Sequence, residues 1–252
     1  MLLKDKNVFI SGGTGHLGEH LVLAFAKNGA NIVFTYHKNK EKAEELISLT
    51  KEISLTKEMP GKTAALPMNV LEQDSVERAV TQCVQELGSI DILINNTGIA
   101  QVMPLPLVEQ EDWDLLFDVN VRGCFFVSKE AIRHMIAANN GGVIINIGSV
   151  AGLRMLEVPV HYAASKAAIH GMTYALAREL TRYKIRVNCI APGLLEGGVG
   201  ANIPPKQLAD YLAHCAAGRP GKPEEVASLA VFLASPEASY INAQVIVCDG
   251  GL

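Results

Sequence analysis

The sequence lacks the features that mark membrane, secreted and nucleic-acid-binding proteins. Its longest apolar run, at 142–153, is interrupted by polar residues and is far shorter than the ~20 residues that a membrane helix needs. The first residues, Met-Leu-Leu-Lys-Asp-Lys, are too few and too charged to resemble a secretion signal. No block of Lys and Arg occurs and the net charge is −4, so electrostatics gives no reason to expect nucleic acid or an anionic membrane as a partner.

Cysteine pairs and metal-binding motifs are also missing. The five cysteines are spread along the chain without a Cys-x-x-Cys pair, which favours buried free thiols in a reducing cytosol and predicts a cytoplasmic protein. His16, His20 and His37 fall in a turn, a helix and a strand end, and no His-Glu-x-x-His motif is present. We therefore expect neither disulfides nor a bound metal.

Short apolar runs alternate with longer helical patterns along the whole chain. The runs are continuous in Val, Ile and Leu, as expected for strands that helices cover on both faces. The predicted strands are Asn7–Ser11, Asn31–Tyr36, Thr63–Asn69, Asp91–Asn95, Val143–Gly148, Ile185–Ile190 and Gln244–Cys248. The predicted helices are Leu17–Asn28, Lys40–Lys57, Asp74–Leu87, Gln110–Ala138, Tyr162–Tyr183 and Pro223–Ala234. This alternation predicts an α/β fold of the Rossmann type, with a doubly wound, seven-stranded parallel sheet.

No linker rich in Pro, Gly or Ser interrupts the pattern, so we expect one domain over residues 1–252. Two segments depart from it. Ile-Ser-Leu-Thr-Lys-Glu occurs at 47–52 and again at 53–58, and because six residues turn a helix through ~600°, the copies cannot present the same face. We interpret the repeat as a neutral extension of the helix or loop that precedes the third strand, ended by Pro60-Gly61. The other segment, 194–217, follows the sixth strand, and we expect it to be a mobile substrate lid.

A glycine turn joins the first strand to the first helix. Ser11-Gly-Gly-Thr-Gly-His-Leu-Gly18 places glycines at 12, 15 and 18. Glycines at such a turn let backbone amides approach a pyrophosphate and let the helix pack on the strand. The position after the strand and before the helix favours a dinucleotide site over a plain turn.

The end of the second strand bears on the choice of dinucleotide. An acid often stands there to bind the ribose hydroxyls of the adenosine, but here the residues are Tyr36, His37 and Lys38. Their positive character favours a 2′-phosphate, and so NADP(H) over NAD(H), with NAD(H) kept as the second possibility. The alternative is that Lys38 and Lys40 only begin a solvated helix.

Tyr162 and Lys166 lie four residues apart in a predicted helix, about one turn, and can meet on one face. Ser149 ends a strand-like run thirteen residues upstream. A free phenol titrates near ~10, and a nearby cation lowers the pKa of a phenol toward a useful range. A hydroxyl, a phenol and an ammonium together suit proton transfer at a carbonyl or alcohol carbon.

These motifs together resemble the short-chain dehydrogenase/reductase family over essentially the whole chain, and most closely its bacterial 3-oxoacyl-(acyl-carrier-protein) reductases. The further elements that carry the resemblance are Asn95-Asn-Thr-Gly98, Asn120 in Asp-Val-Asn-Val-Arg-Gly, Pro192-Gly193, and the tail from Arg219 to Gly251. It implies that Tyr162 is the acid in reduction or the base in oxidation, helped by Lys166, while Ser149 donates to the substrate oxygen.

The resemblance also implies that the Asn120 backbone carbonyl positions a water that relays protons to Lys166. The cofactor contacts that it implies are Gly12, Thr14, Gly15, His16, Leu17, Gly18, His37, Lys38, Asn69, Val70, Asn96, Gly98, Tyr162, Lys166, Pro192, Gly193 and Leu195. No metal is implied.

Four positions depart from the family pattern, all on the cofactor side. His16 stands where the middle glycine is usual, Thr97 replaces an alanine, Asn69 replaces an acid, and Gly197 takes the place of a threonine that reaches the nicotinamide carboxamide. A side chain at position 16 either crowds the pyrophosphate or hydrogen-bonds to it.

Three functions follow from this pattern. The first is an NADP(H)-dependent reductase of 3-oxoacyl thioesters, the second a dehydrogenase of another secondary alcohol such as a sugar or steroid. The third is a catalytically quiet cofactor-binding scaffold.

An acyl carrier protein is one candidate partner. Arg133, Arg178 and Arg182 are candidate docking cations for it, unless they pair with local carboxylates such as Glu179. The family also commonly forms dimers and tetramers through its two long helices and final strand, so we expect a homo-oligomer.

Overall fold

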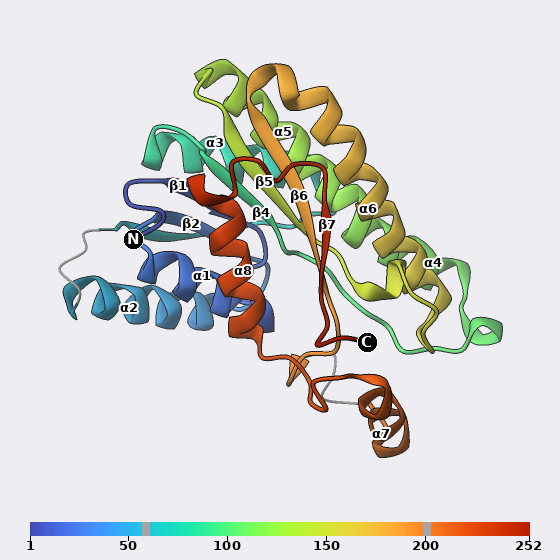
Figure 1. Ribbon diagram of the computed structural model, residues 1–252. Helices are drawn as coiled ribbons and strands as arrows, with labels where there is room; N and C mark the ends of the chain where they lie inside the picture. Colours follow the sequence, from blue (N-terminus) through green and yellow to red (C-terminus); the bar gives the residue numbers. More distant parts are fainter. Residues whose placement is uncertain (57–60, 199–202) are drawn as a thin grey trace.

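A computed structural model describes residues 1–56, 61–198 and 203–252 (Figure 1). In the described chain, seven parallel strands form one sheet in the order β3-β2-β1-β4-β5-β6-β7. The strands are β1 (Asn7–Ile10), β2 (Asn31–Tyr36), β3 (Thr63–Pro67), β4 (Ile92–Asn95), β5 (Gly142–Ile147), β6 (Ile185–Pro192) and β7 (Val245–Cys248). The strand order reverses between β1 and β4, the place where such sheets bind ligands.

Helices cover both faces of the sheet (Figure 1). The longer helices are α1 (His16–Lys27), α2 (Lys40–Thr56), α3 (Gln73–Leu87), α4 (Gln110–Phe117), α5 (Gly123–Ala138), α6 (Val160–Leu180), α7 (Pro205–His214) and α8 (Pro223–Ala234). The short helical turns are η1 (Leu105–Leu107), η2 (Asp118–Arg122), η3 (Val150–Gly152), η4 (Thr181–Tyr183) and η6 (Pro236–Ala238).

Two apolar cores lie on opposite faces of the sheet. Val8 and Ile10 pack with α1, α2 and α8, whereas Phe9 between them packs with α3, α5 and α6. Alternate residues of a strand point to opposite faces, so an uninterrupted apolar run is what a doubly covered strand requires. The predicted doubly wound α/β fold is confirmed.

Several predicted boundaries were wrong. β3 ends at Pro67 rather than Asn69, because the Asn69 side chain accepts a hydrogen bond from the Leu71 amide and turns the chain. β6 continues to Pro192, because β7 pairs with it as far as Cys248. Helix α7 was not predicted and lies within the segment predicted as a lid, of which residues 199–202 are outside the described chain.

The helix predicted over 110–138 is interrupted. A π-helical turn, η2, separates α4 from α5, and within it the Gly123 amide donates to the Asp118 carbonyl. The turn carries Asn120, whose side chain is held by the backbone of Ile99. Such turns inside helices recur at functional sites.

The duplicated hexapeptide lies at the end of α2. Its first copy is helical, and so is the second copy as far as Thr56. Ile47 and its equivalent Ile53 are both half-buried, and Leu49 and its equivalent Leu55 are both exposed, so the burial of these residues does not show the predicted difference between the faces of the two copies. The rest of the second copy and the predicted stop at Pro60 lie outside the described residues.

All five cysteines are free thiols, and four of them are buried. Burial raises the pKa of Cys124 to about 11 and that of Cys189 to about 12, which keeps both thiols protonated and unreactive. In the part of the chain that the structure describes, no helix is long and apolar enough to span a bilayer.

Candidate active site

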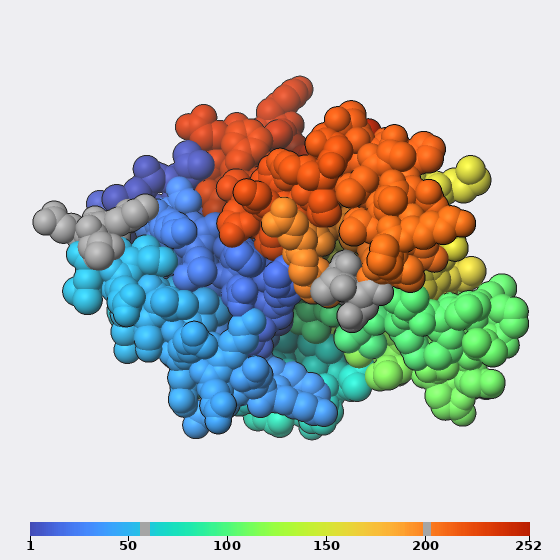
Figure 2. All heavy atoms as spheres, turned by 90° about the horizontal axis from the view of Figure 1, so that it is seen from below, coloured from blue at the N-terminus to red at the C-terminus, as the bar shows by residue number. Residues whose placement is uncertain are grey.

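The carboxyl ends of the central strands converge on one edge of the sheet. β1, β4, β5 and β6 run in parallel and end at Ile10, Asn95, Ile147 and Pro192. Figure 2 looks onto this side of the molecule, where the surface is hollowed between the blue N-terminal segments, the orange segment after β6 and the green segment around α4. The predicted site residues follow these strand ends.

The glycine turn after β1 is shaped by close contacts. A Cβ at Gly18 would lie 2.1 Å from the Gly12 carbonyl oxygen, and one at Gly13 would lie 2.5 Å from the Phe34 ring. Gly12 has a φ of +67° and donates from its amide to Thr35 Oγ1 at 3.1 Å. These three positions therefore need glycine for the fold itself.

Gly15 differs from the other glycines of the turn. It precedes the first residue of α1, and a Cβ there would meet only the Gly12 carbonyl oxygen, at 3.2 Å. The space in front of Gly15 and the free amides at the start of α1 suit a pyrophosphate, because helix N-termini attract anions. The turn thus fits the diphosphate of a dinucleotide.

The residues after β4 brace the glycine turn from behind. Ser11 Oγ accepts from the amides of Asn96 and Thr97, both at 3.0 Å. Asn96 Nδ2 donates to the carbonyl oxygens of Ser11 and Gly12. The Asn96 side chain therefore supports the turn, and Thr97 packs beneath Gly12 with its Oγ1 3.0 Å from where a Cβ would stand.

The end of β2 presents exposed basic groups. Lys40 begins α2 and pairs with Glu44 at 3.5 Å, as the solvated-helix alternative predicts. Lys38 lies before the helix, is exposed, and has no carboxylate partner among the described residues. His37 lines a hollow together with Asn69 and Arg78, next to the place where the strand ends.

Asn69 and Val70 lie in the loop between β3 and α3. Asn69 Nδ2 donates to Glu72 Oε1 at 2.8 Å, and its backbone amide donates to Ser75 Oγ. The Asn69 side chain therefore bonds within its own loop, just before the start of α3. Val70 is buried against Gly123, where a Cβ would lie 2.9 Å from it.

Ser149 lies two residues after the end of β5 and has extended backbone geometry. Its Oγ accepts a hydrogen bond from the Ala151 amide at 3.1 Å, so it caps η3. A hydroxyl oxygen that accepts one hydrogen bond can still donate its own proton in another. Capping of η3 and donation to a substrate oxygen are therefore compatible in this geometry.

Tyr162 and Lys166 lie on one face of α6, as their spacing predicts. Lys166 is only 8% exposed, and its Nζ lies 5.8 Å from the centre of the Tyr162 ring. The ammonium donates to the Ile147 carbonyl at 3.1 Å, which ties α6 to the end of β5. Two further N–H groups of the ammonium remain for other partners.

Asn120 lies beside this pair. Its Oδ1 accepts from the Ile99 amide at 2.8 Å, and its Nδ2 donates to the Ile99 carbonyl and to Ser165 Oγ. A Cβ at Gly98 would stand 3.3 Å from Asn120 Oδ1 and 3.5 Å from Lys166 Nζ. Glycine at 98 therefore leaves room for the two polar groups to approach.

One buried group near the site was missed from the sequence. His170 lies one turn after Lys166, packs under Gly148 and Gly152, and leaves both ring nitrogens without a hydrogen-bond partner. Burial, and then the charge of Lys166, lowers the pKa of His170. The i+4 spacing of His170 from Lys166 is visible in the sequence, but the glycines that enclose its ring are distant in the chain and cannot be identified from it.

The segment after β6, Leu194–Gly198, is fixed at its base; we refer to it as the stem. The Gly193 amide donates to the Cys248 carbonyl, and the Leu194 amide to the Tyr211 hydroxyl at 2.9 Å. Leu195 packs against the core on the α1 side. Pro192, Gly193 and Leu195 thus lie at the carboxyl end of β6, on the edge where the central strands end.

His16 points toward the stem. Its Nε2 lies 2.7 Å from the Glu196 carbonyl oxygen. The sequence predicts that the His16 side chain either crowds the pyrophosphate or hydrogen-bonds to it. Both predictions assume that the ring is turned toward the glycine turn. The ring instead contacts the segment that contains Gly197.

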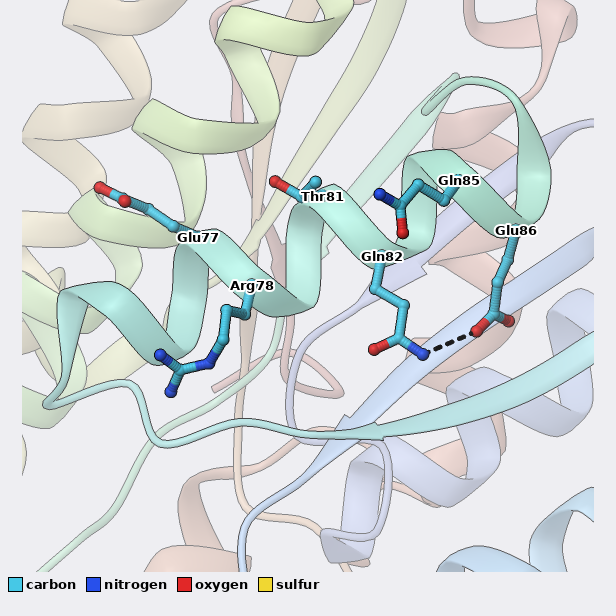
Figure 3. A pocket seen from close by; sticks show the side chains of 6 residues that line it. All are labelled: Glu77, Arg78, Thr81, Gln82, Gln85 and Glu86. Carbon is cyan, nitrogen blue, oxygen red and sulfur yellow. Dashed lines mark hydrogen bonds between the residues drawn. The ribbon is translucent and has the colours of Figure 1, made fainter.

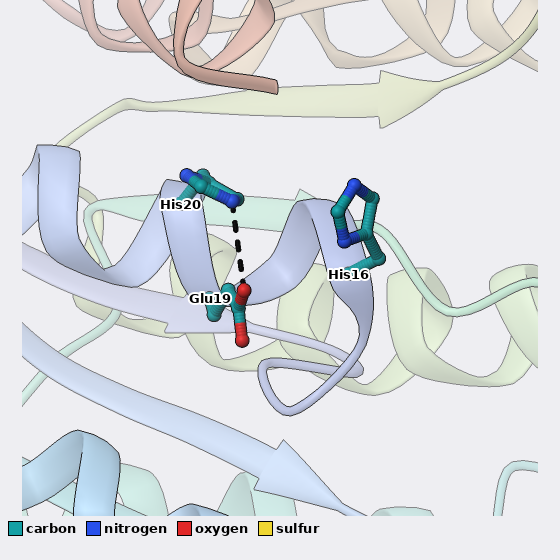
Figure 4. Close-up of side chains that lie close together, drawn as sticks. All are labelled: His16, Glu19 and His20. Atoms are coloured by element: carbon teal, nitrogen blue, oxygen red, sulfur yellow. Dashed lines mark ion pairs between the residues drawn. The ribbon is translucent and has the colours of Figure 1, made fainter. Parts of the chain in front are cut away.

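His16, Glu19 and His20 form a small cluster on α1 (Figure 4). Their ligand atoms all lie within 4.8 Å of one another, close enough for the three side chains to share a metal ion after adjustment. Each is already engaged, since Glu19 pairs with Lys42 and His20 with Glu224 at 3.2 Å. The spacing of the histidines in the sequence does not predict a metal site, but the fold brings the His16 and His20 rings close to each other.

A shallow hollow also runs along the outer face of α3 (Figure 3). All of its lining side chains come from this one helix, and two of them, Gln82 and Glu86, bond to each other. It contains none of the groups at the strand ends, so we assign it no part in the site.

Comparison with known proteins identifies this arrangement. The family model described as "Enoyl-(Acyl carrier protein) reductase" matches residues 14–252. The 3-oxoacyl-[acyl-carrier-protein] reductase FabG of Thermotoga maritima is 39% identical, covering 100% of this chain and 99% of the relative.

Two solved structures share the fold closely. A short-chain dehydrogenase/reductase from Serratia marcescens superimposes with a TM-score of 0.91 at 33% identity, covering 100% of this chain and 99% of the other. A short-chain dehydrogenase from Burkholderia cenocepacia, solved in complex with NADP, gives 0.90 at 29% identity, with the same coverage. The chain therefore belongs to the short-chain dehydrogenase/reductase family, which makes it an NAD(P)-dependent oxidoreductase acting on CH–OH and C=O groups.

Proposed function

We propose that this enzyme is an NADP(H)-dependent reductase of 3-oxoacyl thioesters, formed by one catalytic domain over residues 1–252. The observation that carries the proposal is the buried Lys166 ammonium, held by the Ile147 carbonyl beside the Tyr162 ring. The identity of the relative from Thermotoga maritima, a 3-oxoacyl-[acyl-carrier-protein] reductase, supports the substrate class.

The three side chains divide the work at the substrate oxygen. Ser149 donates its hydroxyl proton to that oxygen, because its Oγ already accepts from Ala151. Tyr162 donates the proton that completes reduction, or accepts it in oxidation, and Lys166 stabilises the phenolate that results. When bound, the nicotinamide supplies or accepts the hydride.

Asn120 supports proton return to Lys166. Its side chain is fully used by Ile99 and Ser165, so we assign the relay to its backbone carbonyl in the π-helical turn, with a water between. The glycine turn, Asn96 and the stem hold the dinucleotide beside these groups.

The decisive experiment follows the nicotinamide absorbance while the protein, NADPH and an acetoacetyl thioester are mixed. We expect turnover that Tyr162→Phe lowers by at least about a hundredfold, because a positioned proton donor contributes on the order of 10²–10⁴. Turnover only with NAD and simple secondary alcohols would favour the second candidate, another alcohol dehydrogenase. Binding of cofactor without any turnover would favour a scaffold.

The preference for NADP(H) rests on Lys38, an exposed cation without a carboxylate partner among the described residues. We expect Lys38→Glu to lower kcat/KM for NADPH by about 10- to 100-fold, the effect of a charged hydrogen bond to phosphate, and to leave NADH nearly unchanged. Lys40→Glu is the matched control, because Lys40 pairs with Glu44. Equal losses with both cofactors would contradict the assignment.

Arg178 and Arg182 support a carrier protein as the form in which the acyl group arrives. Arg133 pairs with Glu130 at 3.2 Å, whereas Arg182 stacks on Tyr183 and neither it nor Arg178 pairs with a carboxylate in the described chain. We expect Arg178→Glu with Arg182→Glu to raise KM for the carrier-bound substrate but not for the coenzyme A thioester, and Arg133→Glu to have little effect.

A further inference from the structure

The His16 side chain and the stem form one close-packed unit. His16 is the first residue of α1, and its Nε2 lies 2.7 Å from the carbonyl oxygen of Glu196, 180 residues further along the chain. A carbonyl oxygen only accepts, so the proton of this hydrogen bond is on Nε2.

The imidazole ring occupies the space that side chains at two stem positions would need. A Cβ at Gly197 would lie 2.7 Å from His16 Cε1, and a Cβ at Gly198 would lie 2.8 Å from His16 Cδ2. Both glycines also have positive φ angles, +72° and +56°, which other residues rarely adopt. The ring in this position therefore requires glycine at both stem positions.

The stem reaches the ring as an ordered segment. Leu195 forms a parallel bridge with Gly221, the Glu196 amide donates to the Gly221 carbonyl at 2.8 Å, and the Gly221 amide donates to the Leu194 carbonyl at 2.9 Å. The contact with His16 adds a second anchor on the opposite side, from α1. Without it, the hydrogen bonds that hold the described stem would be those with Gly221 and Tyr211, besides the packing of Leu195 against the core.

The location of this contact connects it with the cofactor. His16 directly follows Gly15, in front of which the turn leaves space for a pyrophosphate, and it begins the helix whose free amides face that space. A stem anchored to His16 is therefore already ordered beside the diphosphate site before a dinucleotide binds. Binding then loses no further conformational entropy in ordering the stem.

We propose that His16 is a positioning residue that fastens the stem to the start of α1 and so pre-orders the cover of the cofactor site. Two departures from the family pattern, a side chain at 16 and no side chain at 197, are then a single complementary change. The link to cofactor affinity rests on the proposed function, whereas the anchoring of the stem does not.

Hydrogen exchange of the protein without cofactor tests the anchoring directly. We expect His16→Phe, which keeps a ring but loses the donor, and His16→Gly, which loses both, to speed exchange at the amides of Glu196 and Gly221. His16→Gln keeps a donor and should restore part of the protection. His20→Phe, on the same helix and engaged with Glu224, is the matched control and should leave these amides unchanged.

Titration with NADPH, followed by nicotinamide fluorescence, tests the consequence. The loss of one neutral hydrogen bond predicts a dissociation constant about three- to tenfold higher for His16→Phe. Gly197→Thr should weaken binding in both backgrounds, because its φ of +72° is unfavourable for threonine, and the loss should be larger in the wild-type background, where the His16 ring fills the space.

Unchanged hydrogen exchange in His16→Gly, or equal effects of Gly197→Thr in both backgrounds, would overturn the proposal. Absence of NADPH turnover would instead contradict the proposed function, and the exchange result would still decide the anchoring.

Discussion

At the scale of single residues, the glycine turn contains two kinds of glycine. Gly18 is needed by the fold, since a Cβ would lie 2.1 Å from a backbone oxygen, whereas Gly15 has a φ of −70° and a Cβ there would meet only the Gly12 carbonyl oxygen, at 3.2 Å. The sequence motif does not distinguish these two glycines. In the structure Gly18 is needed for packing, whereas Gly15 is next to the proposed diphosphate site.

Substitution by alanine separates these roles. We expect Gly18→Ala to lower the free energy of unfolding by about 3 kcal/mol, because the turn must shift to relieve the overlap. Gly15→Ala should change it by only about 0.5 kcal/mol and instead weaken NADPH binding, since the methyl group would occupy the diphosphate side. Urea denaturation and a cofactor titration on both variants give the comparison, and a folding defect in Gly15→Ala would contradict it.

His170 predicts a pH dependence of stability. Its pKa in the folded protein is lowered by burial and by Lys166, while in the unfolded chain the imidazole titrates near ~6.5. As the pH falls below ~6.5, the imidazole is protonated in the unfolded state but not in the folded state. This group therefore lowers the free energy of unfolding at acidic pH and has no effect on it well above pH ~6.5.

Urea denaturation at pH 7.5 and pH 5.5 measures this contribution. We expect the loss of stability between the two conditions to be smaller in His170→Met, which keeps an apolar side chain of similar size beneath Gly148 and Gly152. The same loss in both proteins would show that His170 does not titrate differently on unfolding.

At the scale of elements, helix α7 fastens the base of the stem. The Tyr211 hydroxyl accepts from the Leu194 amide at 2.9 Å, and a Cβ at Gly193 would lie 2.6 Å from the same hydroxyl. Burial raises the pKa of Tyr211, so its phenol stays neutral near pH 7. Arg154, after η3, pairs with Asp249 at 3.3 Å and joins the loop that follows Ser149 to the C-terminal segment.

We expect Tyr211→Phe to cost about 1–2 kcal/mol, because the Leu194 amide loses its acceptor. Exchange at that amide should quicken, and thermal unfolding should shift to lower temperature. Tyr240→Phe is the control, since the Tyr240 side chain is fully exposed. Identical behaviour of the two variants would indicate that the hydrogen bond does not hold the stem.

At the scale of the whole molecule, exposed apolar side chains gather on α4, α5 and α6. Leu115, Phe125 and Tyr174 are each about half exposed, and a Cβ at Gly171 on α6 would meet nothing within 4 Å. An open glycine and flat apolar side chains suit close packing of a helix against a second copy. We infer that these helices form the contact of a homo-oligomer.

Light scattering should give the mass of a dimer or tetramer for the wild-type protein. Phe125→Asp should shift it toward the monomer, because a carboxylate would be buried in the contact. Leu55→Asp, on the remote and highly exposed end of α2, should not. A wild-type monomer would refute the inference.

The sequence determined the number of strands, their parallel direction and the Tyr162–Lys166 pair. Each of these depends on residues near one another in the chain, namely apolar runs of strand length and a one-turn helical spacing. Only the tertiary structure decided the interruption of the helix at Asn120, which depends on hydrogen bonds to Ile99, and the position of the His16 ring, which depends on the Glu196 carbonyl 180 residues away. Contacts between distant segments leave no periodic trace in a sequence. For that reason two separate departures from the family pattern became one contact only when the chain was folded.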